Sequence, residues 1–354
     1  NFILKLYRAS VKKIIIFKTD RVGDLLHLSG CIRSIYENFK DSKITLICSN
    51  HNFQIAKNYP FIENYIILEK GNYLKTLFHH FNILRSTKHS HLFILDGKNG
   101  SFFMSYFIKA EIRSALCFWK VKQLFNFKYS IYRPNKFLLK IFFNNYIICD
   151  ENYSNTQIKY QDLYFKLLEN IKIKINSRKN HYVLNDEFDS IFLNFYKKYI
   201  NKNYCIFHFD ERWDKYEKED LNNCLKIINI LSSKMKVLIT TGIKPFKYLN
   251  NLESLFSSFN YKNKNFIIKE NKETGNVIIL KNMPLDLLAF FIRNSVKNIS
   301  SHSGPILNIS TAFDVNVVDI IKQSKFNELA RWIPFGAKYK RYSFENLKEN
   351  LDKI

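Results

Sequence analysis

Short apolar runs alternate with amphipathic segments along the first third of the chain. The apolar runs predict buried strands, which span residues 13–17, 43–48, 65–68 and 91–95. The segments whose apolar residues recur every three or four positions predict helices, which span residues 25–39, 54–58 and 74–87. Continuous apolar strands separated by helices are typical of a parallel sheet that is covered on both faces.

The same alternation returns in the second half of the chain, after a predicted helix at 157–169 and a polar stretch at 176–182. Here the predicted strands span residues 204–208, 236–240, 276–280, 296–300 and 315–320. The predicted helices span residues 187–198, 221–232 and 285–294. Two such series predict an α/β fold with two doubly wound, Rossmann-like parallel-sheet domains facing across a cleft.

The polar stretch predicts where one domain ends and the next begins. We expect an N-terminal domain over 1–178, a C-terminal domain over 179–340, and a C-terminal helix over 341–354 that packs back. The length agrees with this division, because 354 residues exceed what one hydrophobic core usually supports.

The composition is that of a globular protein, with 46% hydrophobic and 24% charged residues. The six cysteines are scattered without a CxxC pair, which is typical of reduced thiols and argues against a disulfide framework or a zinc site. No segment has the pattern of a signal peptide or the length of a membrane-spanning helix. We therefore expect a cytoplasmic monomer without a bound metal.

The formal net charge is +24, which favours anionic partners such as nucleic acid, phosphorylated sugars or a membrane surface. The basic residues are dispersed rather than gathered in one block, and this favours a drift of composition over nucleic-acid binding. We expect no nucleic-acid partner. Peripheral contact with the anionic inner face of the cytoplasmic membrane is a by-product that this charge allows.

The turn after the first predicted strand carries candidate catalytic residues, at the strand end where α/β folds bind ligands. Asp24 has the chemistry of a general base, although Asp24 or Asp20 can also cap the following helix. Gly23 would let the backbone turn tightly beside a substrate. Arg21 can steer an anionic acceptor or simply be solvated.

A second candidate site begins at Ser303, Gly304 and Pro305, which follow a predicted strand and open a helix. The unpaired amides and the dipole of a helix N-terminus attract anions, so a diphosphate suits this position. Ser303 can equally be an ordinary N-cap and Pro305 a first-turn proline, and the two interpretations are compatible.

Four segments in chain order resemble the family 9 glycosyltransferases, which are the lipopolysaccharide heptosyltransferases and their relatives. The segments begin KTDRVGDLLH at residue 18, HLFILDGKNG at residue 91, SSHSGPILN at residue 300 and RWIPFG at residue 331. The resemblance implies the GT-B architecture and a metal-independent, inverting transfer of a sugar. The implied co-substrates are a nucleoside-diphosphate sugar donor, such as ADP-heptose, and a lipopolysaccharide-core or other glycolipid acceptor, with no further cofactor.

The resemblance also implies roles for individual residues. Asp24 would take the proton of the acceptor hydroxyl, as the general base. The expected acceptor contacts are Arg21, Gly23, Asp96 and Lys98. The expected donor contacts are Arg212, Lys215, Thr241, Gly242, His302, Ser303, Gly304 and Pro305. Arg212 and Lys215 can instead pair with neighbouring acidic residues at the surface, and Thr241 with Gly242 can equally form a tight turn between a strand and a helix.

Two positions depart from the family pattern. His302 stands where the family has an aspartate that contacts the donor sugar, and Leu307 stands where it has a histidine. These departures motivate an alternative, a catalytically degenerate GT-B protein that binds a nucleotide sugar or an anionic glycan without turnover. A basic nucleic-acid-binding protein is a third hypothesis, and only the net charge supports it.

Overall fold

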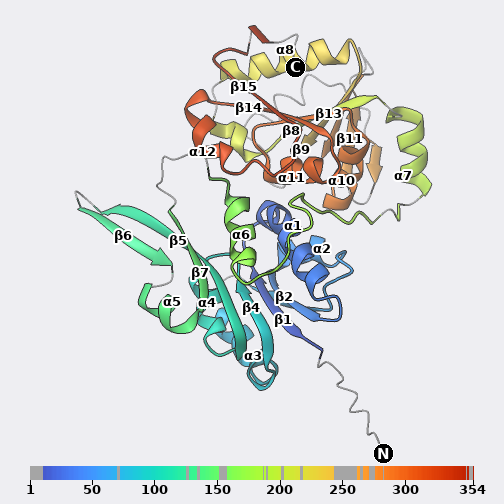
Figure 1. Ribbon diagram of the computed structural model, residues 1–354. Coiled ribbons are helices and arrows are strands. Elements are labelled where there is room, and N and C mark those ends of the chain that lie inside the picture. The colour runs from blue at the N-terminus through green and yellow to red at the C-terminus, as the bar shows by residue number, and fades with distance from the viewer. Residues whose placement is uncertain are drawn as a thin grey trace, which may run out of the picture. The chain divides into compact units, whose positions relative to one another are not determined.

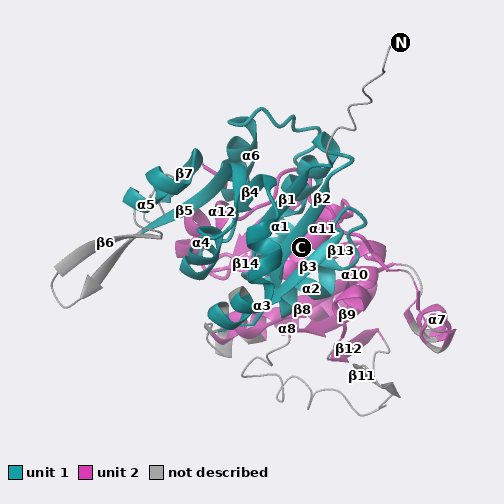
Figure 2. Ribbon diagram, turned by 90° about the horizontal axis from the view of Figure 1, so that it is seen from below, with its two compact units in different colours: residues 1–155, 160–178 teal, residues 156–159, 179–354 magenta. Residues whose placement is uncertain are grey.

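The computed structural model divides the chain into two compact units (Figure 2), unit 1 with Asn1–Asn155 and Tyr160–Arg178, and unit 2 with Thr156–Lys159 and Lys179–Ile354. The structure describes residues 11–69, 72–124, 127–133, 136–150, 158–185, 187–188, 190–200, 203–215, 218–242, 261–263, 266–270, 276–281, 283–347, 349–350 and 354.

Unit 1 is a seven-stranded sheet with helices on its faces (Figure 1). Its strands are β1 (Lys13–Lys18), β2 (Lys43–Ser49), β3 (Asn64–Leu68), β4 (His89–Ile94), β5 (Ala110–Leu124), β6 (Phe127–Arg133) and β7 (Asn145–Asp150). Its helices are α1 (Val22–Asn38), α2 (Asn50–Ala56), α3 (Tyr73–Ser86), α4 (Asn99–Ser105), α5 (Lys136–Phe142) and α6 (Tyr160–Glu169).

The strand order places β1 in the middle of this sheet. Strands β3, β2, β1, β4 and β5 are neighbours in that order, and all pair in parallel. Ser114 and Ala115 of β5 pair with both β4 and β7, so β7 continues the parallel sheet on the far edge of β5. The second half of β5 forms an antiparallel hairpin with β6 (Figure 1).

Unit 2 repeats this plan with an eight-stranded sheet. Its strands are β8 (Tyr204–Phe209), β9 (Lys236–Thr241), β10 (Tyr261–Asn263), β11 (Phe266–Glu270), β12 (Val277–Lys281), β13 (Lys297–Ser300), β14 (Asn316–Ile321) and β15 (Tyr339–Ser343). Its helices are α7 (Ser190–Phe195), α8 (Lys218–Ser232), α10 (Leu285–Asn294), α11 (Gly304–Ala312) and α12 (Phe326–Ala330). A π-helix, η1 (Tyr196–Ile200), and the 3₁₀-helices η2 (Glu211–Lys215) and η3 (Gln323–Lys325) complete it.

The parallel part of this second sheet has the order β12, β9, β8, β13, β14, β15, and β11 and β10 extend it in antiparallel fashion. In each unit the first strand therefore lies between the second and the fourth parallel strand. This is the doubly wound order of dinucleotide-binding folds, and it confirms the predicted fold class.

The two faces of the central strand β1 bury different groups. Ile15 and Phe17 belong to a core cluster that also contains Leu84 of α3, Phe102 of α4 and Leu139 of α5. On the other face, the fully buried Lys18 reaches the phenol oxygen of Tyr164 in α6, and α6 packs against α1. The helices α3, α4 and α5 thus cover one face of the sheet, and α6 with α1 covers the other.

The observed elements extend or correct several predicted ones. Strands β5 to β7 and β15 were not predicted. Helix α1 begins at Val22 rather than at residue 25, so Gly23 lies in its first turn and not in the tight turn expected there. Of the expected helix over 341–354, residues 341–343 belong to β15 and residues 344–347 form turns. Phe344, Leu347 and Ile354 nevertheless pack into the core of unit 2.

We predict that unit 1 loses stability in acid through His91. Burial, with a smaller effect of Lys12, lowers the pKa of this imidazole in β4 from 6.5 to about 4. The unfolded chain therefore binds the proton first as the pH falls from 6.5 to 4, which costs the folded state roughly 2–3 kcal/mol. The ring stacks on Phe93, so His91→Phe should fit and should flatten the fall in melting temperature across this range. Replacing the exposed His51 by Gln is the control, and an unchanged slope in His91→Phe would contradict the prediction.

Candidate functional site

In unit 1, the carboxyl ends of β1 and β4 are neighbours at the point where the strand order reverses. Doubly wound sheets bind ligands at such a switch point, because the two following connections leave toward opposite faces and open a crevice at the strand ends. We call the segments that follow β1 and β4 the crevice loops of unit 1. Residues 19–24 follow β1 here, and residues 95–98 follow β4. The structure therefore brings together the candidates from both segments, Arg21, Gly23, Asp24, Asp96 and Lys98.

Asp96 joins these two segments through a set of short hydrogen bonds. Its Oδ2 accepts from the amide of Thr19 at 3.1 Å, from the Thr19 hydroxyl at 2.6 Å and from the Ser101 hydroxyl at 2.6 Å. Its Oδ1 accepts from the amide of Lys98 at 3.1 Å, while the Lys98 ammonium donates to the carbonyl of Thr19 at 2.5 Å. Asp96 is buried, and both of its oxygens accept hydrogen bonds, so this side chain holds the crevice loops together.

A buried ion pair lies beneath this loop. The ammonium of Lys18 donates to Asp20 Oδ2 at 2.7 Å and to the carbonyl of Leu95 at 3.0 Å. Burial opposes the charge of Lys18, but the carboxylate of Asp20 and the neighbouring Tyr164 keep the pKa of the ammonium raised. Asp20 Oδ1 is buried and has no hydrogen-bond partner among the described residues. Burial raises the pKa of Asp20 to about 7, against the opposing effect of Lys18.

Asp24 lies in the first turn of α1, where its Oδ2 accepts from the amide of Arg21 at 3.3 Å. This contact is a helix cap, one of the two roles expected from the sequence. It engages one carboxylate oxygen only, and Oδ1 bonds to no described residue. The side chain is half-buried and lies close to the carboxyl end of β1, so a role as general base stays a prediction that this geometry allows.

In unit 2, the equivalent switch point lies between the carboxyl ends of β8 and β13, which are paired neighbours. Arg212 follows β8 in η2, where its amide donates to Asp210 Oδ1 at 3.0 Å. The guanidinium nitrogen Nη1 of Arg212 is buried and has no partner in the described part of the chain. This half-buried guanidinium therefore has a buried N–H donor that no described residue pairs with, and an anion would satisfy it.

The remaining donor candidates after β8 and β9 lie along the same edge of the sheet. Thr241 ends β9 opposite Phe209, and the amide of Gly242 donates to the carbonyl of Phe209 at 2.8 Å. Lys215 ends η2, and its side chain lies outside the part of the molecule that the structure describes.

His302 and Asp319 form a buried pair beside α11. The imidazole Nδ1 lies 2.7 Å from Asp319 Oδ2, and the His302 amide donates to Asp319 Oδ1 at 3.0 Å. Asp319 also accepts from the hydroxyls of Ser300 at 2.8 Å and Tyr339 at 3.0 Å. His302 has a left-handed backbone with φ of 56°, a strained conformation for a non-glycine residue. The imidazole Nε2 is therefore held in place and bonds to no described residue.

The first turn of α11 has backbone donors to spare. Ser303 occupies the N-cap without a capping bond from its hydroxyl, and Pro305 lies in the first turn, as expected. The amides of Gly304 and Ile306 make no hydrogen bond to described residues, as is usual where a helix begins. Leu307 of α11 is buried, and its apolar side chain offers this site no polar group.

Sequence reasoning missed Asp319, Tyr339 and the buried state of Lys18. A signal was present for two of them, since an ionisable residue within or at the end of an apolar strand is rare unless it is paired. Among the described residues, no group of three or more His, Cys, Asp or Glu side chains could hold a metal ion. Within the same residues, no helix has the length and apolar character needed to cross a bilayer.

No protein-family model and no curated protein sequence matches this chain. Solved structures do match it. A family 9 glycosyltransferase from Veillonella parvula superimposes with a TM-score of 0.69 at 14% identity, covering 97% of this chain and 89% of that one. The E. coli heptosyltransferase WaaC with ADP gives a TM-score of 0.61 at 13% identity, covering 96% and 97%.

The same fold also occurs in another class of enzyme. A UDP-GlcNAc 2-epimerase from Methanocaldococcus jannaschii matches with a TM-score of 0.56 at 15% identity, covering 97% of this chain and 92% of that one. At sequence identities this low, a structural match shows the fold alone. The superpositions confirm the GT-B-like, two-domain α/β fold and the structural resemblance to family 9 glycosyltransferases.

We predict that Gly97 is required for the crevice loop of unit 1. Its φ is +60°, and an added Cβ would lie 2.1 Å from Cδ2 of Phe118. Gly97→Ala should therefore cost about 3 kcal/mol, since a steric clash adds to the strain of the left-handed backbone. Gly336 is the matched control, because its φ is +76° with nothing within 4 Å, so Gly336→Ala should cost only about 1 kcal/mol. Denaturant unfolding of both variants measures the difference, and equal losses would contradict the clash.

Proposed function

We propose that this protein is an inverting, metal-independent glycosyltransferase. It moves a sugar, heptose by resemblance, from a nucleoside-diphosphate donor to a lipopolysaccharide-core or other glycolipid acceptor. Unit 2 binds the donor and unit 1 holds the acceptor together with the general base. The observation that carries the proposal is the buried Nη1 of Arg212, which bonds to no described residue. Arg212 follows β8 at the switch point of unit 2, and β8 pairs with β13, the strand that leads into α11.

The donor side of the proposal rests on complementary charge. A diphosphate needs several hydrogen-bond donors and a compensating positive charge. Arg212 Nη1 and the amides of Gly304 and Ile306 are donors that no described residue uses, and they lie at the carboxyl edge of paired strands. His302 would contact the donor sugar or its phosphates through Nε2. The cation stabilises the negative charge that develops on the leaving diphosphate.

The acceptor side of the proposal rests on Asp24. The acceptor hydroxyl oxygen attacks the anomeric carbon from the face opposite the diphosphate, and the bond between that carbon and the diphosphate oxygen breaks. The hydroxyl proton passes to the carboxylate of Asp24, whose Oδ1 is not used by the helix cap. The configuration at the anomeric carbon is inverted because the displacement occurs in a single step.

The alternative remains a degenerate protein that binds a nucleotide sugar without turnover. The replacement of the family's aspartate by His302 favours it, because a basic side chain cannot accept the same hydrogen bonds from a sugar as a carboxylate. The two functions share the donor site and differ only in turnover, so binding and turnover have to be measured separately.

We predict that Arg212→Gln weakens diphosphate binding selectively. Loss of a charge-assisted hydrogen bond in a partly desolvated site should lower the affinity for ADP or UDP by about 10–100-fold. Affinity for the matching nucleoside, which lacks the phosphates, should not change. Isothermal titration of wild type, Arg212→Gln and the exposed control Arg293→Gln measures this. Failure of the wild type to bind any nucleoside diphosphate would overturn the proposed function.

We predict that Asp24→Asn abolishes turnover while preserving the fold. An asparagine oxygen can still accept from the Arg21 amide, so the cap is kept, whereas a neutral amide cannot take the proton. Acceptor-dependent release of nucleoside diphosphate from a panel of nucleotide sugars should fall by about 10²–10⁴-fold.

Asp24→Ala provides the matched comparison, because it removes both the base and the cap. It should lose the same activity and, in addition, about 1 kcal/mol of stability. An Asp24→Asn variant as active as wild type would leave Asp24 a capping residue only. Donor binding without release from any donor, in the wild type as well, would establish the degenerate protein.

A further inference from the structure

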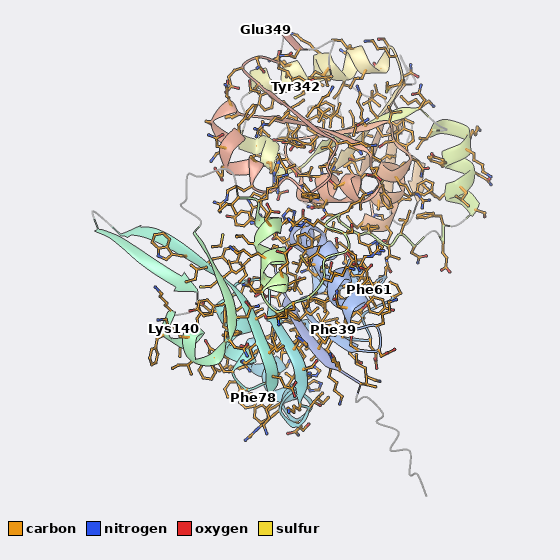
Figure 3. The ribbon with its side chains drawn as sticks, viewed as in Figure 1. Phe39, Phe61, Phe78, Lys140, Tyr342 and Glu349 are labelled. Carbon is orange, nitrogen blue, oxygen red and sulfur yellow. The ribbon has the colours of Figure 1, made fainter. Side chains whose placement is uncertain are left out.

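One face of unit 1 exposes an unusual share of large apolar side chains. Twelve such exposed residues lie in the described part of the chain, and seven of them lie on α3, on α4 with the turn after it, and on α5. Phe78 of α3 and Phe137 of α5 are the most exposed, at 74% and 68% (Figure 3 labels Phe78). We call this set the apolar–basic face, and its apolar members are Leu74, Phe78, Ile83, Phe103, Phe107, Phe137 and Ile141.

The charged residues on the three helices of this face are all basic. Helices α3, α4 and α5 contain no aspartate or glutamate, whereas α1 and α6 on the opposite face of the sheet carry several. Lys75, Arg85, Lys109 and Lys140 are exposed among the apolar residues and form no ion pair with described residues. Helices α2, α7 and α11 also lack acidic residues. Within unit 1, however, α1 and α6 on the opposite face carry them, so the two faces of this sheet differ in charge.

The helices form one continuous surface. Phe81 of α3 contacts Phe107 at a ring distance of 6.2 Å, and Tyr106 contacts Phe142 of α5 at 4.4 Å. Since all three helices bury their inner sides in the same core cluster, their exposed side chains face away from the sheet together.

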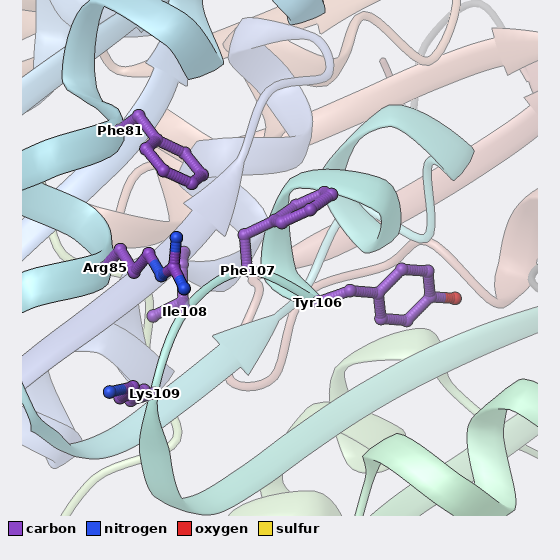
Figure 4. A pocket seen from close by; sticks show the side chains of 6 residues that line it. All are labelled: Phe81, Arg85, Tyr106, Phe107, Ile108 and Lys109. Atoms are coloured by element: carbon purple, nitrogen blue, oxygen red, sulfur yellow. The ribbon is translucent and has the colours of Figure 1, made fainter.

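A pocket of about 390 Å³ opens within this face, between α3 and the turn after α4 (Figure 4). Phe81, Phe107 and Ile108 give it apolar walls, and Arg85 and Lys109 supply two cations. Apolar walls beside guanidinium and ammonium groups suit a phosphate headgroup that is attached to an acyl chain.

We infer that the apolar–basic face docks unit 1 onto an anionic phospholipid bilayer. Exposed aromatic side chains enter the interfacial region, and the cations lie against the lipid phosphates. The two contributions act together. The basic residues attract the protein to the anionic surface over about one Debye length, and the apolar side chains then enter the lipid. A second copy of the chain fits this face poorly, because two purely basic surfaces repel each other. Membrane docking is independent of the transfer reaction and needs no donor site.

Sedimentation of the 354-residue chain with vesicles tests the inference. Wild type should bind vesicles of equimolar phosphatidylcholine and phosphatidylglycerol, and bind poorly to phosphatidylcholine alone or at high salt. The double variants Phe78→Ser with Phe137→Ser, and Lys75→Gln with Lys140→Gln, should each lower the partition coefficient by about tenfold or more. The matched control pairs Phe335→Ser with Lys340→Gln, exposed residues of unit 2, and should bind as wild type does.

Three results would overturn the inference. The wild type would fail to bind anionic vesicles, the control would lose as much binding as the face variants, or the face variants would bind as well as the wild type. A fourth contrary result would come from size-exclusion chromatography. If the wild type is a dimer and the phenylalanine double variant a monomer, the face is an interface between copies of the chain. Circular dichroism of each variant confirms that binding is lost by a folded protein, since all the substituted side chains are exposed.

Discussion

In both units the first strand lies in the middle of the sheet. The position of the polar groups at the strand ends depends on this strand order. The chain proceeds from β1 toward one edge and returns through β4 toward the other, and β8 and β13 repeat the pattern. The connections after these strands leave in opposite directions, so the backbone cannot close over the strand ends. Polar side chains must fill the crevice, because the amides and carbonyls exposed there have no neighbouring strand to pair with.

The polar residues of the two crevices divide by how completely the protein satisfies them. Asp96 and Asp319 each accept four hydrogen bonds, and they fix the loops around them. Asp20, Arg212 and His302 each keep an atom that no described residue engages. A buried polar atom costs free energy while it is unpaired, and Asp20 Oδ1 and Arg212 Nη1 are buried. A ligand that bonds to such atoms removes that cost, which makes them candidate contacts.

The sequence predicted the parallel core because its strands are buried on both faces and therefore read as continuous apolar runs. It did not predict β5, whose charged residues interrupt the apolar pattern and whose second half leaves the parallel sheet for a hairpin. The role of Asp319 was out of reach for a different reason. It depends on the register that pairs Ser300 with Asp319 across β13 and β14, and register is a property of two strands and not of one. The glycine with a left-handed backbone at this site is Gly97, whereas Gly23, where a tight turn was expected, lies within α1. The close approach of Phe118 to Gly97 arises only in the folded sheet, so the sequence could not predict it.

The distribution of charge over the surface also could not be predicted from the sequence. A value of +24 spread along the chain reads as composition, because spacing in sequence says nothing about which residues share a surface. Folding brings basic residues together: the connections after β3, β4 and β6 place α3, α4 and α5 on one face of unit 1, and each of these helices lacks acidic residues. A glycolipid acceptor is confined to a membrane, so an enzyme that docks there searches a surface and not a volume. The same crossover rule that opens the crevice of unit 1 therefore also assembles its apolar–basic face, from helices that no local pattern connects.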